Sequence, residues 1–182
     1  MPEEQPGRLG KLPQGAPTTA YTHRGPKAEA EVGQIRLARP DSGPSVTVLI
    51  IEVHAGYVQG LLCGDDYPLA TETDAVLEPR QSGCLGRVLV HGDVSAAILK
   101  TRLAEVLGAT TPELVERIVL RGLGRDFDSA DLGRGTPILA DDDPRWEWKL
   151  EQLRRVRGVR ARASELGWTL HTLGAGNSDP AA

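Results

Sequence analysis

The chain has 182 residues and a formal net charge of -4, and 40% of its residues are apolar but only 4% are aromatic. This length fits one domain with tails, because domains most often contain about 100 to 150 residues. Because the chain is acidic overall, it has no general excess of basic residues that could bind nucleic acid, so any such site must be a local patch. No apolar run approaches the roughly 20 residues that cross a bilayer, and residues 1–10 lack the apolar core of a secretory signal. We therefore expect a cytoplasmic protein that makes no membrane contact.

The first predicted element is an arm, residues 1–31, rich in Pro, Gly, Gln, Thr and Ala. It has no apolar periodicity, and we expect it to be disordered because it cannot bury enough surface to offset chain ordering. A β-rich domain, residues 32–122, follows. Alternating residues at 34–39 predict a half-buried strand. The β-branched run 46–53 predicts a central strand buried on both faces, and 57–63 returns as the second arm of a hairpin.

Shorter strands are predicted at 75–77 and 87–90, and the polar turn His91-Gly92-Asp93 is expected to end the second. Residues 95–107 fit either a helical stripe or the beginning of a strand. Thr111-Pro112 is a strong helix start, because Thr serves as an N-cap and Pro fits the first helical position.

The C-terminal third has three predicted parts. Residues 123–143 form a linker rich in Gly and Asp, 144–168 a basic helix in which Gly158 is a weak point, and 169–182 a disordered tail. Between residues 144 and 166 there are seven basic residues and three acids, a local charge of +4 that leaves about -8 on the remainder. This asymmetry is the clearest electrostatic feature of the sequence.

The order of these elements resembles the MazF/PemK family of toxin endoribonucleases. The resemblance covers roughly residues 33–122 and rests on Gly33-Gln34-Ile35-Arg36-Leu37, Gly43-Pro44 before 46–51, 70–77, Ser82-Gly83-Cys84-Leu85, 88–94, 102–108 and the helix from Thr111. It implies an α+β, mainly β fold: a small, strongly bent antiparallel barrel with C-terminal helices. It also implies a homodimer that cleaves single-stranded RNA without a metal or other cofactor, and an antitoxin peptide as partner.

The sequence departs from the family at two positions. The family has an Arg before the Pro that opens its long strand, where this chain has Gly43, and the family's Ser or Thr after the hairpin return falls near Gly64 and Asp65. Metal-free RNA cleavage needs a base for the ribose 2′-hydroxyl and a cation for the developing phosphorane charge. As substitutes we predict His91 as proton carrier, oriented by Asp93, with Arg87 on the phosphate. Further RNA contacts are predicted at Arg80, His54, Arg154 and Arg155.

Each of these assignments has a structural alternative. Asp93 could cap the following segment, His91 could simply end a strand, and the arginines could be solvated surface charges. The basic helix could bind RNA through Arg and Trp side chains, bind a protein partner, or pack on the barrel through Trp146, Leu150, Leu153 and Val156. The second functional class is therefore a catalytically degenerate barrel that acts as a protein-interaction or regulatory module.

No metal site is predicted. Consecutive carboxylates such as Asp65-Asp66 and 141–143 point in divergent directions, and Asp143 also suits the N-cap of the basic helix. Cys63 and Cys84 have no CxxC or His spacing for zinc, so we interpret them as two buried thiols, although a disulfide between them is an open alternative.

Overall fold

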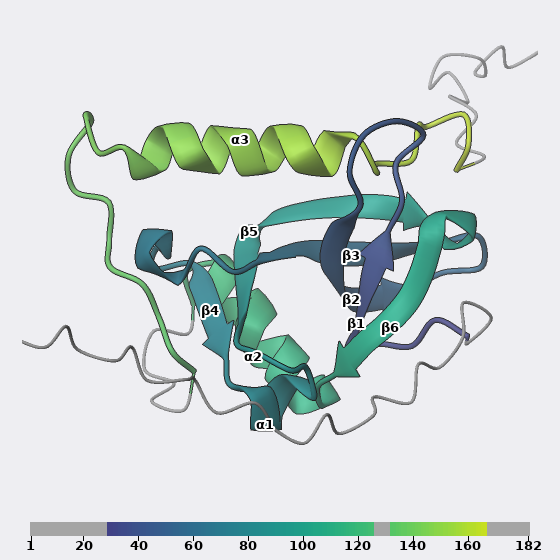
Figure 1. The fold of residues 1–182 in the computed structure, drawn as a ribbon, viewed down its shortest axis with the longest axis horizontal. Helices are drawn as coiled ribbons and strands as arrows, with labels where there is room; N and C mark the ends of the chain where they lie inside the picture. The colour runs from purple at the N-terminus through teal and green to yellow at the C-terminus, as the bar shows by residue number, and fades with distance from the viewer. Residues whose placement is uncertain (1–28, 126–131, 167–182) are drawn as a thin grey trace, which may run out of the picture.

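The computed structural model describes residues 29–125 and 132–166, so most of the predicted arm 1–31 and all of the tail 169–182 lie outside the described residues. One antiparallel sheet contains six strands in the order β4-β5-β3-β2-β1-β6 (Figure 1). The strands are β1 (Gln34–Ala38), β2 (Val46–Val53), β3 (Tyr57–Gly64), β4 (Asp74–Leu77), β5 (Val88–Leu99) and β6 (Leu103–Ala109). The helices are α1 (Pro79–Ser82), α2 (Pro112–Gly122) and α3 (Arg145–Arg157), with 3-10 turns η1 (Tyr67–Leu69) and η2 (Lys100–Arg102).

The α+β class and the antiparallel sheet agree with the prediction from sequence. Strands β4 and β6 are the two edges, and the described residues contain no pairing that closes the sheet, so a barrel is not confirmed. The sheet is irregular where β3 meets β5. Leu61 pairs with Ser95 but Cys63 pairs with Val90, so β5 has extra residues opposite Leu62. Such an irregularity bends the longer strand, and β5 pairs with β3 on one side and β4 on the other.

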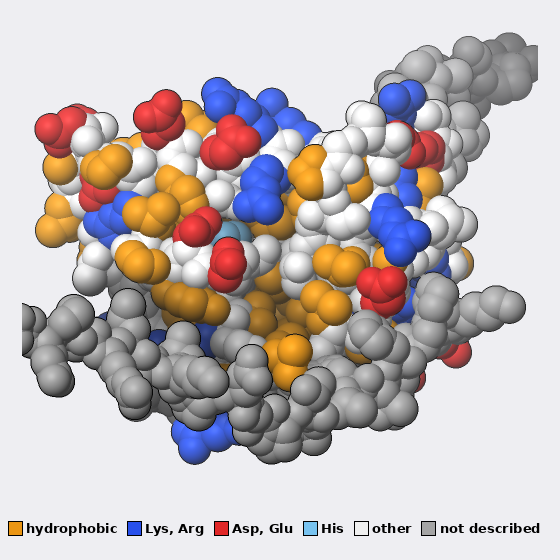
Figure 2. Space-filling view, viewed as in Figure 1, with side chains coloured by type: hydrophobic (Ala, Val, Ile, Leu, Met, Phe, Trp, Pro, Cys, Tyr) orange, Lys and Arg blue, Asp and Glu red, His pale blue; other side chains and the backbone are white. Residues whose placement is uncertain are grey.

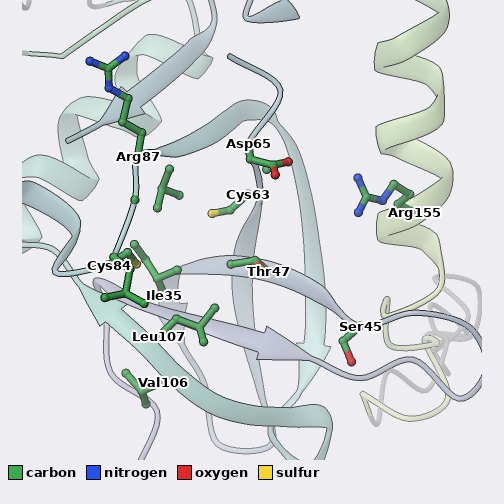
Figure 3. Close-up of a pocket in the computed structure, with 14 residues that line it drawn as sticks. Ile35, Ser45, Thr47, Cys63, Asp65, Cys84, Arg87, Val106, Leu107 and Arg155 are labelled. Atoms are coloured by element: carbon green, nitrogen blue, oxygen red, sulfur yellow. The ribbon is translucent and has the colours of Figure 1, made fainter. Parts of the chain in front are cut away.

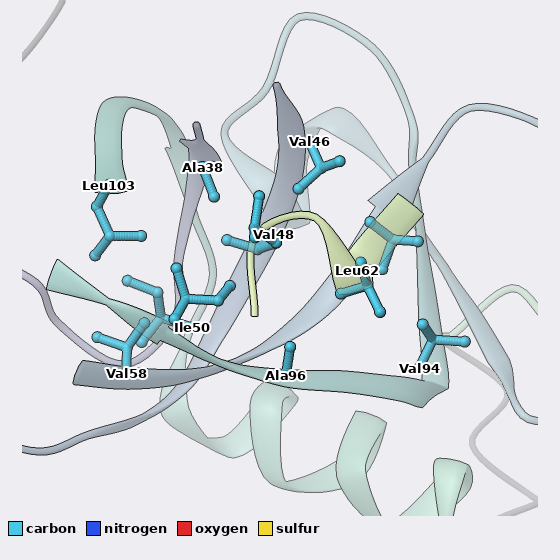
Figure 4. Packing of buried hydrophobic residues seen from close by; sticks show 12 residues of the cluster. Ala38, Val46, Val48, Ile50, Val58, Leu62, Val94, Ala96 and Leu103 are labelled. Carbon is cyan, nitrogen blue, oxygen red and sulfur yellow. The ribbon is translucent and has the colours of Figure 1, made fainter. Parts of the chain in front are cut away.

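A hydrophobic layer covers each face of the sheet, as Figure 1 shows with α3 on one side and α2 on the other. Strand β2 explains why: Val48 and Ile50 belong to the cluster beneath α3, whereas Leu49 belongs to the cluster beneath α2. The continuous apolar run 46–53 therefore reflects a strand buried on both faces, as predicted. Figure 4 shows the first cluster, in which side chains of β1, β2, β3 and β5 meet.

Helix α3 presents a different face to the sheet from the one that its apolar residues predict. Lys149, Gln152 and Val156 are buried, whereas Trp146, Leu150 and Leu153 are 51%, 54% and 38% exposed. The alternative in which the last three pack on the sheet is therefore wrong. The reason is a buried carboxylate on the sheet that draws Lys149 inward, as the next subsection describes. The helix also ends at Gly158, the predicted weak point, instead of continuing to 168.

Two further differences concern loops. The predicted linker 123–143 is not free of the domain, because Gly133 and Thr136 form bridges with Val76 and Thr71. The buried Arg121 donates hydrogen bonds to the carbonyl oxygens of Leu132 and Gly133 at 3.3 and 3.1 Å and so ties this segment to α2.

The predicted strand end at 91–93 is also wrong, because β5 continues to Leu99. Gly92 allows this: its backbone touches that of Gly122, and a Cβ built at Gly92 would lie 2.8 Å from the Gly122 Cα. The ambiguous segment 95–107 is consequently the end of β5, the turn η2 and the start of β6. The predicted helix start at Thr111 is confirmed, since the Thr111 hydroxyl accepts a hydrogen bond from the Leu114 N–H.

Candidate functional site

A cavity of about 440 Å³ lies between the start of β2, the end of β3 and the loop that precedes β5 (Figure 3). Ser45 and Thr47 supply hydroxyls from β2, and Gly64 and Asp65 come from the end of β3. The remaining wall is largely apolar and is formed by Ile35, Leu85, Val88, Val106 and Leu107. A concave, mainly apolar surface with a few polar groups is typical of a ligand site.

Two arginines line this cavity, from parts of the chain 68 positions apart. Arg155 extends from α3 toward the cavity and faces the side on which the Asp65 carboxylate lies (Figure 3). Its guanidinium also donates to the Gln152 side chain at 3.1 Å, which steadies it. Arg87 points away from the cavity centre in the same view, and its Nε lies 3.0 Å from a Glu78 carboxylate oxygen. Arg155 is therefore the cation directed at a bound ligand, and Arg87 lies at the rim.

The two cysteines also line the cavity, and both are free thiols. Burial raises the pKa of Cys63 far above its ordinary value, and burial likewise raises the pKa of Cys84. The thiolate is the nucleophilic form, so neither residue is suited to covalent catalysis at neutral pH.

His91 and Asp93 lie outside this cavity, in a network beneath α3. The His91 side chain is 1% exposed, and its Nδ1 lies 3.3 Å from Oδ1 of Asp74, which is fully buried. Lys149 Nζ donates to Asp74 Oδ1 at 2.6 Å and to Asp93 Oδ1 at 2.7 Å. The Trp148 ring contacts His91 edge to face, with centroids 5.0 Å apart.

This network satisfies a carboxylate that would otherwise be costly to bury. Burial alone would raise the pKa of Asp74, but the hydrogen bond from His91 and the positive charge of Lys149 lower it below its usual value. The Thr71 N–H and hydroxyl donate to the second oxygen at 2.7 and 2.9 Å. His91 is enclosed and its partner is Asp74, not Asp93, so the geometry favours a structural role for His91 and Asp93 over proton transfer to a substrate.

The other predicted RNA contacts do not converge on the cavity. His54 stacks on Tyr57 with ring centroids 4.3 Å apart, in the β2–β3 turn at the opposite end of β2 from Ser45. Arg80 lies on α1 and is not a lining residue. Arg154 is exposed and pairs with Glu151 at 3.2 Å. Of the predicted site residues, the structure thus brings together only Arg87 and Arg155 at the cavity.

No known family model matches the chain, and no curated protein matches it. The site must therefore be judged from its own chemistry. In the described ranges, 29–125 and 132–166, no group of three or more His, Cys, Asp and Glu residues could hold a metal ion. No helix in these ranges is long and apolar enough to cross a membrane.

Sequence reasoning missed Asp74 and Lys149, and it considered Asp65 only as a departure from the family and as a metal ligand. No local signal identified Lys149, because Asp74, the buried partner that draws it inward, lies 75 positions earlier in the chain.

Proposed function

We propose that this chain is a divergent MazF/PemK-like protein that binds single-stranded RNA in the 440 Å³ cavity and cleaves it without a metal ion. The observation that carries the proposal is that Arg155 and Asp65 face one another across a cavity formed by the ends of β2 and β3. The family resemblance also directs attention there, since its two motif positions correspond to Gly43-Pro44, next to Ser45, and to Gly64-Asp65. The antiparallel α+β architecture agrees with the resemblance, whereas the closed barrel that the resemblance implies is not confirmed, because β4 and β6 remain edge strands in the described residues.

In the proposed reaction Asp65 is the base and Arg155 the electrostatic catalyst. The ribose 2′-oxygen attacks the adjacent phosphorus, and its proton passes to the Asp65 carboxylate. The bond between phosphorus and the 5′-oxygen breaks, and that oxygen takes a proton from water, so the products are a 2′,3′-cyclic phosphate and a 5′-hydroxyl. Arg155 neutralises the charge of the phosphorane, because a guanidinium presents paired donors to phosphate oxygens. The apolar wall accommodates a base.

The test uses the purified full chain with labelled single-stranded RNA of mixed sequence in the presence of EDTA. Asp65→Asn is expected to slow cleavage by about 10²- to 10⁴-fold, as for loss of a general base, with little change in affinity. Arg155→Gln should weaken both binding and cleavage. Arg154→Gln is the matched control, since it removes the neighbouring charge from the same helix but not from the cavity. Unaltered cleavage in Asp65→Asn would refute the assignment of the base, and RNA that remains uncut by the full chain would refute the nuclease.

A second candidate function is supported by the flank of α3 that borders Thr71–Thr73 and Val94. Trp146, Leu150 and Leu153 form an exposed apolar stripe at helical spacing, which favours a degenerate domain that binds a protein such as an antitoxin. Leu150→Glu separates the two proposals: it should abolish partner capture if α3 is the docking element and leave RNA cleavage unchanged. Growth arrest on expression that Asp65→Asn relieves would favour the nuclease.

A further inference from the structure

A row of arginines at 157, 160 and 162 begins at the last residue of α3 and continues along the segment that follows it. The backbone of this segment is anchored to the sheet, because the Ala161 N–H donates to the Ala97 carbonyl at 2.7 Å and Arg102 donates to the carbonyls of Val159 and Arg160 at 3.3 and 3.2 Å. Buried and exposed positions alternate along it. Val156, Val159 and Ala161 are buried, and the exposed positions include Arg157, Arg160 and Arg162.

These three arginines line a groove of about 640 Å³ beside the sheet. The opposite side of the groove is made by small or polar residues of β3 and β5, namely Gln59, Ser95, Ala96 and Ala97. No acidic residue lines the groove, and in the part of the chain that the structure describes no ion pair engages any of the three guanidinium groups. The adjacent Glu165 accepts instead from Arg102 at 3.1 Å and from the Arg162 N–H at 2.6 Å.

Among the described residues, these three positive charges therefore have no ion-pair partner, in a chain whose net charge is -4. Figure 2 shows Lys and Arg side chains over α3 with Asp and Glu side chains among them, in contrast to the groove, whose lining contains no acidic residue. Like charges held this close repel one another, so an anion in the groove would stabilise them. Guanidinium groups suit phosphate oxygens in particular, because their planar donors bind two oxygens at once.

We infer that this groove is a second nucleic-acid site, which binds the sugar-phosphate backbone of single-stranded RNA independently of base sequence. No aromatic side chain lines the groove, so it offers phosphate contacts without base stacking. The groove and the cavity share no lining residue, although Arg155 and Arg157 belong to the same helix turn. The inference rests on the proposed function for the identity of the strand, and it adds contacts to phosphates other than the one that is cleaved.

The test measures affinity of the full chain for a fluorescein-labelled uridine 20-mer by anisotropy at several salt concentrations. The variant Arg157→Gln/Arg160→Gln/Arg162→Gln is expected to bind about tenfold more weakly at 0.1 M salt, as for loss of three exposed ion pairs. The slope of log affinity against log salt should fall in magnitude by about 2, because each phosphate contact on a single strand contributes about 0.7.

The matched control is Arg39→Gln/Lys100→Gln/Arg154→Gln, which removes the same charge from exposed or partly exposed positions that do not line the groove. Equal affinity and slope in the two triple variants would overturn the groove as a site. A urea midpoint equal to that of the unmodified chain shows that both variants are folded.

Two further measurements separate this inference from others. Cleavage of a dinucleotide, whose one phosphate must lie in the cavity to be cleaved, should be lost in Arg155→Gln but kept in the groove variant, so failure of the groove and failure of the cavity give different results. Sedimentation with phosphatidylserine vesicles tests a lipid surface as the alternative ligand. Vesicle binding that the groove variant loses, without loss of RNA affinity, would refute the RNA assignment.

Discussion

Replacing Lys149 with Met should destabilise the protein strongly. Lys149 is 6% exposed and lies 2.6 Å from a carboxylate oxygen of the fully buried Asp74. Methionine fills a similar volume but leaves that carboxylate without its cation. Removing one partner of a buried ion pair costs about 3 to 5 kcal/mol, because the remaining charge is buried without compensation. For a chain of this size each kcal/mol lowers Tm by about 2 to 4 °C, so a decrease of about 6 to 20 °C is expected.

Urea denaturation of the full chain, followed by circular dichroism and tryptophan fluorescence, measures this loss. Arg154→Met is the control, because its pair with Glu151 is exposed on both sides and such pairs contribute at most about 1 kcal/mol. The double variant Asp74→Asn/Lys149→Met should be at least about 1 kcal/mol more stable than the sum of the single effects predicts, since it leaves no buried charge. A loss of less than about 1 kcal/mol in Lys149→Met would refute the reasoning.

Three other predictions concern stability. Because folding lowers the pKa of Asp74, its carboxylate stabilises the folded protein above the unfolded pKa of about 3.9, and this stabilisation is lost as the pH falls below that value. The free energy of unfolding, measured from pH 6 to 3, should therefore decline less in Asp74→Asn than in the unmodified chain. Thr111→Ala removes the N-cap of α2 and should cost about 1 kcal/mol in a urea titration, whereas no change would show that the hydroxyl contact to Leu114 is unimportant. Gly122→Ala places a Cβ 2.1 Å from the Gly92 carbonyl oxygen, so a lower Tm is expected, and an unchanged Tm would contradict this contact.

The strands were predictable where local pattern and burial agree. The nearly continuous run 46–53 identified β2, and Thr111-Pro112 located the start of α2. Alternation at 34–39 located β1, but the predicted half-buried strand is wrong, because Gln34 and Arg36 are buried as well. These signals arise from neighbours in sequence. The continuation of β5 through Gly92 was not predictable, because it depends on a backbone contact with Gly122, which is 30 positions later.

The orientation of α3 shows a similar limit. Its apolar residues predicted one inner face, but Asp74, 75 positions earlier, draws Lys149 to the other. Only some residues that line the candidate cavity were predictable from the sequence. Arg87 and Arg155 were selected individually as phosphate contacts, and the structure places both on the cavity. Their proximity to Asp65 depends on how α3 crosses the sheet, which no local pattern specifies.

The position of α3 in the chain also affects how the domain folds during translation. Val156 and Val159 complete the hydrophobic layer on one face of the sheet, yet they are among the last described residues to leave the ribosome. Until Val156 and Val159 emerge, the side chains of Val48 and Ile50 lack these packing partners on the nascent chain. Completion of this hydrophobic layer therefore waits until α3 and Val159 have been synthesised, and a fragment that lacks them would be prone to aggregation.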